Sequence, residues 1–498
     1  MIRINGIRLS LTQTEEKLQD KILKTLRITP ADLRNWKIVR RSLDARKKED
    51  IHYVYVIDAE VKNEKKLLAK DKKLTAAPDE SYHFPEGSWS GTMRPVVVGF
   101  GPAGMFAALI LAEMGLNPLI LERGGDVDSR REAVDTFWES GKLSLDNNVQ
   151  FGEGGAGAFS DGKLTTRIKD GRCHKVLEEL VEAGAPEEIL YENKPHVGTD
   201  RLQPAVKNIR KKIIALGGEV RFFTQVTDLV IKNGALQAVV TQNGEEIPCQ
   251  DAIFALGHSA RDTFFTLYEN GIAMEQKPFA MGVRIEHDQQ MINESQYGSY
   301  AGKLPAADYR LTYTTQKGRG VYSFCMCPGG YVVAASSEEG RLAVNGMSYH
   351  ARDGKNANAA LLVQVYPEDF GDSHPLAGVR LQRKLEEAAF RAGGGDYTAP
   401  VQRVGSFLTG KEVLKEETEV QPTYRPGVKE TDLHEVLPTF ITEALEEALP
   451  QMGKKLHGFD CPNAIMTAVE SRSSSPVRLL RGGDGQSLSL SGFFPAGE

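Results

Sequence analysis

One continuous stretch of the chain, residues 96–124, constrains the fold more than any other. It reads VVVGFGPAGMFAALILAEMGLNPLILERG. An apolar run at its start suits a buried parallel strand, and Gly99, Gly101 and Gly104 follow in GxGxxG spacing. An alanine-rich helix then leads to a second apolar run that ends on Glu122, 23 residues after Gly99. This order of strand, glycines, helix, strand and acid predicts a dinucleotide-binding βαβ unit.

Each part of this unit has a physical role. Gly99 permits a tight turn, Gly101 lets a pyrophosphate approach the backbone, and Gly104 lets helix and strand pack closely. The start of the helix offers unpaired N–H groups and about half a positive charge to phosphate oxygens. Glu122 can accept both hydroxyls of an adenosine ribose. The alternative interpretation is a glycine-rich turn in an ordinary α/β domain.

The chain is long enough for more than one domain. Its 498 residues are more than usually fold around a single hydrophobic core, so two or three domains are expected. Residues 1–75 are interpreted as a small α+β domain, followed by a linker at 76–94. Apolar periodicity there predicts a helix at Thr14–Leu26 and strands at Ile2–Leu11, Trp36–Arg40 and Ile51–Val61.

A second group of strands follows the βαβ unit. Residues 219–257 are interpreted as a strand, a three-stranded meander with Asn-Gly turns, and a returning strand, Ala252–Leu256, that stops at Gly257. This order resembles the FAD-binding domain of glutathione-reductase-like flavoproteins, although their last strand usually ends in Ala-Thr-Gly. The resemblance implies that Val226 lends its backbone to the adenine. It also implies a closing strand from the C-terminus that delivers an acid, Glu498, to the ribityl chain.

The predicted fold class is α/β. A Rossmann-type FAD-binding domain, built from a parallel sheet and a β-meander, carries an inserted α+β substrate domain and the small N-terminal α+β domain. Residues 95–264 are expected to form the first part of the FAD-binding domain, and residues 461–498 return to it. Between them, residues 265–460 are expected to form the substrate or cap domain, first strand-rich and then helix-rich.

Several longer segments resemble one bacterial family, the uncharacterised FAD-dependent dehydrogenases. These segments are RRSLDARKKEDIHYVY (40–55), VQFGEGGAGAFSDGKLTTR (149–167), YSFCMCPGGYVVAAS (322–336), VNGMSYHARDGKNANAALLVQV (344–365) and VESRSSSPVRL (469–479). The resemblance implies FAD and a redox reaction but no particular substrate. In that family a glycine-rich turn and a helix follow a segment like GFFPAGE, where this sequence ends. We therefore expect weaker FAD binding than in a version extended by family-like residues.

The candidate cofactor contacts come from the βαβ unit and from a second glycine-rich loop. This loop, NNVQFGEGGAGAFSDGKLTT at 147–166, also carries Ser160 and Lys163. Its N–H groups can form a nest around phosphate or flavin oxygens, whereas the alternative is an irregular surface loop. The residues predicted to contact FAD are Gly99, Gly101, Pro102, Ala103, Gly104, Glu122, Arg123, Gly154, Gly155, Ala156, Lys163, Val226, Gly257 and Glu498.

Two cysteines are candidate catalytic groups. Cys325 and Cys327 lie two residues apart, so in an extended strand both sulfurs face one side and can reach one pocket. A disulfide at this spacing would be strained and easily reduced. The functional interpretation is a redox-active or substrate-contacting thiol pair beside the flavin. The alternative is two small residues that pack the substrate sheet.

Cationic and polar side chains give the remaining catalytic candidates. Arg472 and Arg478 enclose a hydroxyl-rich loop, which can bind an anionic substrate or stabilise the charge of reduced flavin. Structural arginine hydrogen bonds explain the same pattern equally well. Arg352 and Asn356 are lesser candidates. His258 is expected near the cofactor, where a structural role is favoured over proton donation.

Charge and cysteine content bound the partners and the compartment. Residues 1–90 hold 19 Lys/Arg against 14 Asp/Glu, or +5, which leaves −11 of the net −6 for the remainder. This basic module can contact RNA or an acidic protein partner. Because aromatic residues do not alternate with its lysines and arginines, the favoured interpretation is a charged face exposed to solvent. Five cysteines suit a reducing cytoplasm. No long apolar run or leader predicts a membrane span or export.

The sequence therefore predicts an FAD-dependent oxidoreductase. It would move a hydride or two electrons between the flavin and an unidentified small organic substrate or NAD(P)H. Because the sequence holds one GxGxxG unit, NAD(P)H is expected to dock transiently in the substrate cleft. The alternatives are a flavin-dependent RNA-modifying protein and a non-catalytic partner protein. No Walker loop, nucleophile elbow or zinc-ligand spacing is present, so hydrolase, kinase and metal chemistry are not predicted.

Overall fold

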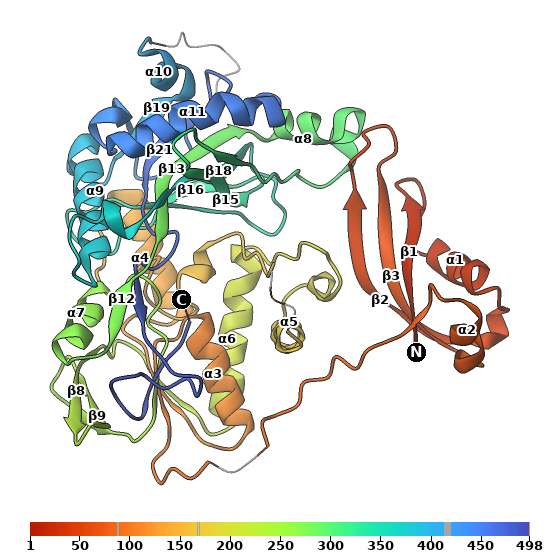
Figure 1. Ribbon diagram of the computed structural model, residues 1–498, viewed down its shortest axis with the longest axis horizontal. Coiled ribbons are helices and arrows are strands. Elements are labelled where there is room, and N and C mark those ends of the chain that lie inside the picture. Colours follow the sequence, from red (N-terminus) through yellow and green to blue (C-terminus); the bar gives the residue numbers. More distant parts are fainter. Residues whose placement is uncertain (87–88, 167, 169, 413–419, 498) are drawn as a thin grey trace. The chain divides into compact units, whose positions relative to one another are not determined.

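The computed structural model describes residues 1–86, 89–166, 168, 170–412 and 420–497. The chain forms two compact units (Figure 1). The first unit comprises Met1–Pro85, Lys163–Val197 and Asn293–Pro305, and the second unit comprises Glu86–Gly162, Gly198–Ile292 and Ala306–Glu498. The domain boundaries expected from the sequence stay a prediction.

The first unit is built on an antiparallel sheet with strand order β2-β3-β1-β4. Along β1, isoleucines and a leucine are buried in alternation, as the period of a strand requires. Helix α1 adds Leu18, Ile22 and Leu26, whose spacing of four places them on one face against that sheet. The elements are β1 (Ile2–Ser10), α1 (Lys17–Leu26), β2 (Leu33–Asp44), β3 (His52–Val61), α2 (Glu64–Lys70), β4 (Thr75–Ala76) and α5 (Arg172–Glu182).

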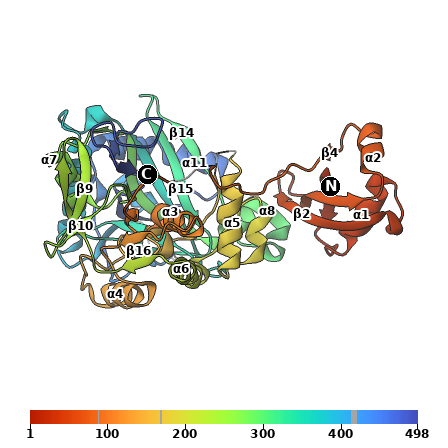
Figure 2. The same ribbon diagram turned by 90° about the horizontal axis from the view of Figure 1, so that it is seen from below.

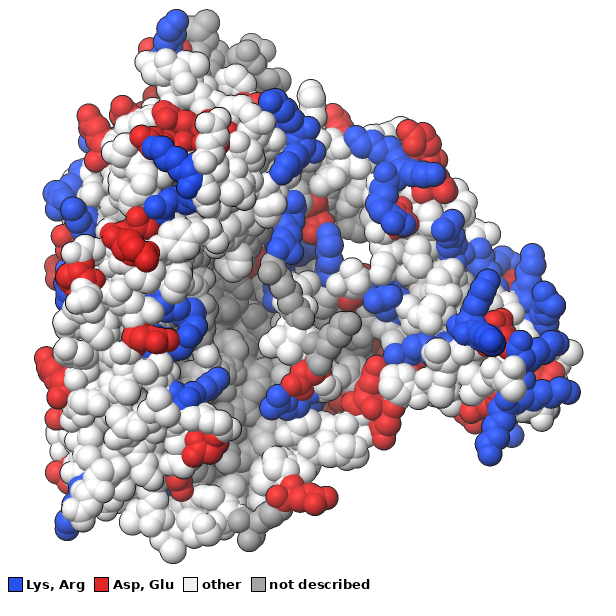
Figure 3. Space-filling model, in the orientation of Figure 1, with Lys and Arg blue, Asp and Glu red and all other residues white. Residues whose placement is uncertain are grey.

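Lysine and arginine side chains are spread over the first unit (Figure 3). Six lysines around α2, at positions 62, 65, 66, 70, 72 and 73, are exposed. Glu64 and Asp71 lie between these lysines in the chain, so the stretch carries negative as well as positive charges. Contact of this face with RNA or with an acidic protein stays a prediction.

The second unit contains a parallel five-stranded sheet with order β23-β11-β5-β6-β7. Its central strands β5 and β6 are buried on both faces, as is typical of parallel strands. Helices α3 and α6 lie side by side and contact the sheet (Figure 1, Figure 2). These elements are β5 (Val96–Val98), α3 (Pro102–Glu113), β6 (Leu119–Leu121), α6 (Thr199–Ala215), β7 (Glu219–Arg221), β11 (Ala252–Phe254) and β23 (Phe493–Pro495).

The predicted meander packs against the same sheet. Strands β8 (Val226–Lys232), β9 (Ala235–Thr241) and β10 (Glu246–Pro248) form an antiparallel sheet of their own. Its buried apolar residues share one core with β5, β6, β11 and β23. The glycines of both predicted Asn-Gly turns, Gly234 and Gly244, have positive φ, which glycine adopts without steric cost. The α/β fold with a parallel sheet and a β-meander is confirmed.

The second unit also contains a mixed seven-stranded sheet, in the order β14-β15-β18-β13-β21-β19-β20. Its central strands, β13 and β18, pair antiparallel along their whole length and are almost wholly buried. Helices α9 (Ala377–Gly393) and α11 (Thr439–Lys455) contact its strands. The strands are β13 (Phe279–Asp288), β14 (Thr312–Thr314), β15 (Gly320–Cys327), β18 (Asn356–Val365), β19 (Ala399–Arg403), β20 (Val428–Glu430) and β21 (Ile465–Glu470).

The other elements of the chain are short hairpins and connecting helices. They are α4 (Val127–Ser140), α7 (Arg261–Glu269), β12 (Met274–Gln276), α8 (Gln289–Tyr297), β16 (Tyr331–Ala334), β17 (Val344–Met347), α9 (Ala377–Gly393), α10 (Val404–Thr409), α11 (Thr439–Lys455) and β22 (Val477–Leu479). Within the described ranges, no helix is both long and apolar enough to cross a membrane.

The closing strand β23 gives a test of the sheet. Phe493 is fully buried, and its ring stacks on Phe254 of β11 with 4.1 Å between ring centroids. Replacing this ring with a methyl group leaves a cavity, so Phe493→Ala should lower the free energy of unfolding by about 3–5 kcal/mol. Urea unfolding measures the loss. The matched control is Phe494→Ala, whose side chain is half-buried, and equal losses for both variants would contradict this packing.

Candidate functional site

A cavity of about 380 Å³ lies at the carboxyl ends of β5, β6 and β11 in the second unit. This edge of a parallel sheet is where nucleotide ligands bind in doubly wound folds. The second glycine-rich loop and the start of the meander also line the cavity. Of the residues predicted to contact FAD, the wall contains Gly99, Gly101, Pro102, Ala103, Glu122, Arg123, Gly155, Ala156, Val226 and Gly257.

Glycines shape the floor of this cavity. Gly99 has φ +96°, and a Cβ there would lie 2.5 Å from the carbonyl oxygen of Ala255. A Cβ on Gly155 would lie 2.9 Å from the Cα of Gly101, so the two glycine-rich loops approach each other where neither carries a side chain. Gly101 is the N-cap of α3 and Pro102 its first residue. Unpaired N–H groups of this helix therefore begin at the cavity.

Glu122 is a buried acceptor for backbone N–H groups of three segments. Its Oε2 accepts from Phe100 at 2.7 Å, and its Oε1 accepts from Gly124 and Gly152 at 2.9 Å each. A carboxylate offers about four acceptor positions, so about one is left for a ligand. The sequence predicted that Glu122 accepts hydrogen bonds from both ribose hydroxyls. With three backbone donors already bound, the carboxylate has about one acceptor position left for them.

Arg130 of α4 holds the second glycine-rich loop and was not predicted from the sequence. Its guanidinium is fully buried and donates to the carbonyl oxygens of Asn148, Val149 and Glu153 at 2.7–2.8 Å. Burial lowers the pKa of this guanidinium to about 10. An arginine that donates to carbonyls of a distant loop leaves no periodic pattern, and no sequence signal could have identified it.

Glu153, in the same loop, is held by two further contacts. Its Oε2 accepts from the N–H of Val127 at 2.9 Å, and its Oε1 lies 2.8 Å from Nε of Arg210. Its neighbour Gly154 donates its N–H to the carbonyl of Phe100 at 2.9 Å. Gly154 therefore joins the two glycine-rich segments and is not part of the cavity wall.

Arg123 and Phe151 form one side of the cavity. The guanidinium lies 4.3 Å from the Phe151 ring centroid and pairs with Asp262, with 3.1 Å between Nη1 and Oδ1. Stacking on an aromatic face is a preferred arrangement for arginine. Both side chains line the cavity. The predicted contact of Arg123 with the cofactor is thus compatible with its position.

The structure places two other predicted contacts, Gly104 and Lys163, outside the cavity wall. Gly104 lies within α3, where an added Cβ would collide with the carbonyl oxygen of Gly99. Lys163 belongs to the first unit, where it forms an isolated bridge with His196. Glu498 lies outside the described residues, although its neighbour Gly497 lines the cavity.

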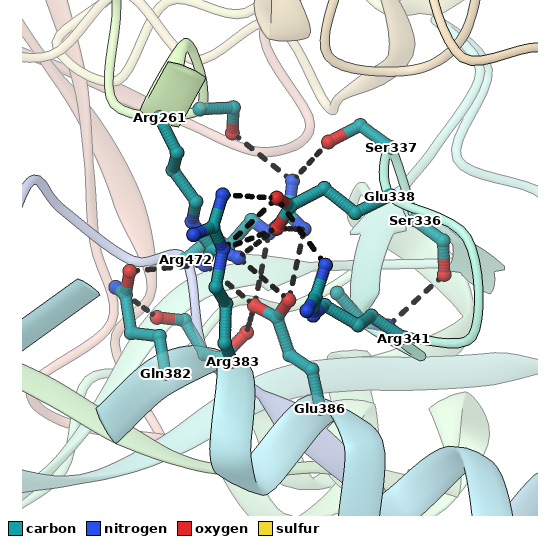
Figure 4. A network of polar contacts seen from close by, with 12 residues as sticks. Arg261, Ser336, Ser337, Glu338, Arg341, Gln382, Arg383, Glu386 and Arg472 are labelled. Carbon is teal, nitrogen blue, oxygen red and sulfur yellow. Dashed lines mark hydrogen bonds and ion pairs between the residues drawn. The ribbon is translucent and has the colours of Figure 1, made fainter. Parts of the chain in front are cut away.

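Arg472 belongs to a buried network of charges behind the cavity wall (Figure 4). Its guanidinium donates to both oxygens of Glu386 at 2.9 and 3.0 Å, and Arg261 donates to the same two oxygens at 2.7 and 2.8 Å. The two guanidinium groups hold the pKa of Glu386 well below its usual range. Arg472 also donates to Ser259, which lines the cavity, at 3.3 Å.

Arg478 is not part of this network. It is exposed and pairs with Glu275 at 3.0 Å between Nη1 and Oε1. It lines a second cavity of about 560 Å³ together with Lys277 and Arg481. The two arginines predicted to share one anion site therefore occupy different places in the structure.

Cys325 and Cys327 do not lie on a regular strand. The pairing of β15 with β18 shifts between Phe324 and Cys327, and Cys325 has φ +41°. The thiol of Cys327 donates to the carbonyl of Cys325 at 3.3 Å. Both cysteines are thiols, and neither lines the two cavities described above. The expectation that extended geometry directs both sulfurs into one pocket is corrected, because a bulge interrupts the strand.

The lesser candidates have structural contacts. Arg352 pairs with the fully buried Asp161 through Nε at 2.9 Å, and the amide of Asn356 donates to Glu286 at 2.9 Å. His258 lines the first cavity, where burial and nearby arginines lower its pKa to about 4. Over the described part of the chain, no group of three His, Cys, Asp or Glu side chains is placed to hold a metal ion.

Comparison with solved structures gives partial likenesses. A glycerol-3-phosphate dehydrogenase from Bacillus halodurans, solved with FAD, matches 60% of this chain and 52% of its own at 13% identity and a TM-score of 0.28. A glycine oxidase from Bacillus cereus matches 55% of this chain and 76% of its own at 12% identity and a TM-score of 0.24. Likeness at this level says nothing about activity.

Sequence comparison is more informative. Residues 278–473 match a family model described as FAD-dependent protein, C-terminal domain-like, and residues 1–60 match a domain of unknown function, DUF8436. The prediction of FAD as cofactor is thereby confirmed, whereas the glutathione-reductase-like superfamily stays a prediction. An uncharacterized protein of Clostridium beijerinckii is 52% identical over 506 residues, which cover 100% of this chain and 94% of that protein. The chain therefore belongs to the same family as the Clostridium beijerinckii protein, and its residues 278–473 match the FAD-dependent model.

Proposed function

We propose that this chain is an FAD-dependent oxidoreductase that holds FAD in the cavity at the carboxyl ends of β5, β6 and β11. One observation carries the proposal. The two glycine-rich loops meet there at Gly101 and Gly155, beside the start of α3 and the carboxylate of Glu122. An added Cβ at either glycine would meet the backbone of the other loop, so the two glycines let the loops approach closely enough to form a cradle for a dinucleotide.

The residues around the cavity divide the recognition of FAD between them. Backbone N–H groups at the start of α3, beside Gly101, would bind the pyrophosphate. The acceptor position left on Glu122 would bind one ribose hydroxyl, and the backbone at Val226 would contact the adenine. Ala156 would add an N–H group from the second loop, whereas the N–H of Gly155 donates to the carbonyl oxygen of Gly152 at 2.9 Å. The bound flavin supplies the two-electron chemistry itself, and the protein positions it and excludes water.

The donor and the acceptor of electrons belong to the same proposal. An organic substrate or NAD(P)H would reduce the flavin, with NAD(P)H docking only transiently, because the chain has one βαβ unit in which a strand leads directly into GxGxxG and a helix. The seven-stranded sheet and its helices would form the substrate side of the site. Arg472 would act on the cavity through Ser259, 3.3 Å from its Nη1.

FAD binding tests the proposal directly. Purified protein mixed with FAD should show the visible bands of a bound oxidised flavin, and FAD at 100 times its Kd should add about 2.7 kcal/mol to the free energy of unfolding. Gly101→Val should lower the affinity about tenfold, equivalent to about 1.4 kcal/mol, because its side chain would press on the backbone of Gly155 and distort the cradle. An unaltered spectrum and an unaltered Tm in the parent protein would refute the proposal.

The loop that Arg130 holds gives a second test. Arg130→Met leaves three carbonyl oxygens without their buried donor, so we expect a loss of about 3 kcal/mol in stability and weaker FAD binding. The control is Arg131→Met, because Arg131 is the next residue of the same helix and is exposed. Chemical unfolding and FAD titration compare the two. Equal behaviour of both variants would show that the loop does not depend on this guanidinium.

The thiol pair gives a third test. Since neither Cys325 nor Cys327 lines the cavity and the Cys327 thiol is bonded to backbone, we expect Cys325→Ser and Cys327→Ser to leave flavin reduction and reoxidation unchanged. Stopped-flow absorbance of the flavin bands, with dithionite and then oxygen, follows both half-reactions. A slower half-reaction in either variant would assign the thiols a role in electron transfer.

A further inference from the structure

His258 directly follows Gly257 at the end of the returning strand and lines the cavity. We propose that His258 presents an unprotonated Nε2 to the cavity and accepts a hydrogen bond there from a sugar or ribityl hydroxyl of FAD. The inference rests on the proposed FAD site. It follows from a series of hydrogen bonds from Gln150 to Ser259 to His258, in which the position of each proton determines the position of the next.

The amide of Gln150 has one possible orientation. Its Nε2 donates to the carbonyl oxygen of Ala335 at 3.0 Å, and a carbonyl can accept only from the nitrogen side of the amide. The Oε1 atom therefore faces Ser259, whose Oγ lies 3.1 Å away. Since Oε1 cannot donate, the Ser259 hydroxyl must give its proton to Gln150.

Ser259 in turn fixes the tautomer of His258. Its Oγ accepts from Nη1 of Arg472 at 3.3 Å, and the arginine is always protonated. With its only proton on Gln150, the hydroxyl can meet the Nδ1 of His258, 2.9 Å away, only as an acceptor. The ring must therefore carry its proton on Nδ1, which leaves the lone pair on Nε2.

The surrounding charges keep this ring neutral. Burial lowers the pKa of His258 to about 4, and the positive charges of Arg472, Arg261 and Lys277 act in the same direction, against Glu386. At neutral pH the ring has no positive charge with which to pair a phosphate. Within the described residues, no protein donor is paired with Nε2, so this acceptor is left for a ligand in the cavity.

The chemistry of FAD leaves few partners for such an acceptor. Phosphate oxygens are acceptors and repel a lone pair, whereas ribose and ribityl hydroxyls donate. Below pH 4 the ring gains a proton on Nε2 and becomes a donor, so this hydrogen bond is lost. FAD affinity should therefore fall as the pH drops through about 4 if the inference holds, and only in proteins that keep His258.

The first experiment measures the tautomer without any ligand. Nitrogen-15 NMR of histidine-labelled protein distinguishes the two neutral tautomers, and His258→Gln identifies the signal. We expect the proton on Nδ1 near pH 7 in the parent protein. Ser259→Ala should remove this preference. A parent ring protonated on Nε2, or positively charged at pH 7, would overturn the inference whether or not FAD binds.

The second experiment measures affinity. His258→Phe keeps a planar ring without an acceptor and should weaken FAD binding about threefold to tenfold, the range of one neutral hydrogen bond. His258→Gln keeps an acceptor and should retain most of the affinity. Equal FAD affinity in the parent and in His258→Phe would overturn the inference, whereas a parent protein that binds no FAD would instead refute the proposed function.

Two fragments of the cofactor identify the hydroxyl. ADP carries the ribose hydroxyls, and FMN carries the ribityl hydroxyls. If His258→Phe weakens ADP binding as much as FAD binding, the donor lies in the adenosine half of the cofactor, which carries the ribose hydroxyls. If it weakens FMN and FAD but not ADP, the donor lies in the flavin half, which carries the ribityl hydroxyls. No loss with any of the three ligands contradicts the inference.

Discussion

The carboxylate of Glu122 is the contact on which the site depends. It accepts N–H groups from Phe100, Gly124 and Gly152, which belong to the glycine turn, the end of β6 and the second loop. These donors are buried, and without an acceptor each would cost about 1–3 kcal/mol. One side chain at the end of a buried strand thus fixes three segments around the cavity. The acid expected to bind a ribose is first a structural acceptor, and its ligand contact uses the position that remains.

Arg130 complements this arrangement from the other side of the second loop. Glu122 takes an N–H group of the loop, whereas the guanidinium of Arg130 takes its carbonyl oxygens. The loop therefore needs no helix or strand of its own to satisfy its buried backbone groups. Freed from that requirement, it can bring Gly155 against Gly101 without side chains between them. This cavity is therefore formed by two glycine-rich loops that approach each other closely, and not by one glycine-rich turn alone.

The sequence could predict the structural features that depend on residues close together in the chain. The β5–α3–β6 unit and the meander turns follow from local patterns of apolar residues and glycine, and they were predicted almost residue by residue. Arg130 could not be predicted, because its partners lie in a loop about 20 residues away and have no pattern. The thiol pair shows the converse. A period of two places Cys325 and Cys327 on one face, but a bulge ends that period within the strand.

The buried charges around Arg472 show why a hydroxyl-rich loop between arginines gives no unique interpretation. The carboxylate of Glu386 pairs with two guanidinium groups, those of Arg261 and Arg472, so it is one negative charge between two positive charges. Glu338 supplies a second carboxylate, 2.6 Å from Nη1 of Arg261. Removing one member of such a buried set of charges is costly in stability. The ion pairs alone therefore explain why arginines occur at these positions, without any bound ligand. Yet Arg472 keeps one N–H for Ser259, and through it the network sets the proton on a ring at the cavity wall. A structural ion pair and an influence on the cofactor are therefore two consequences of one geometry.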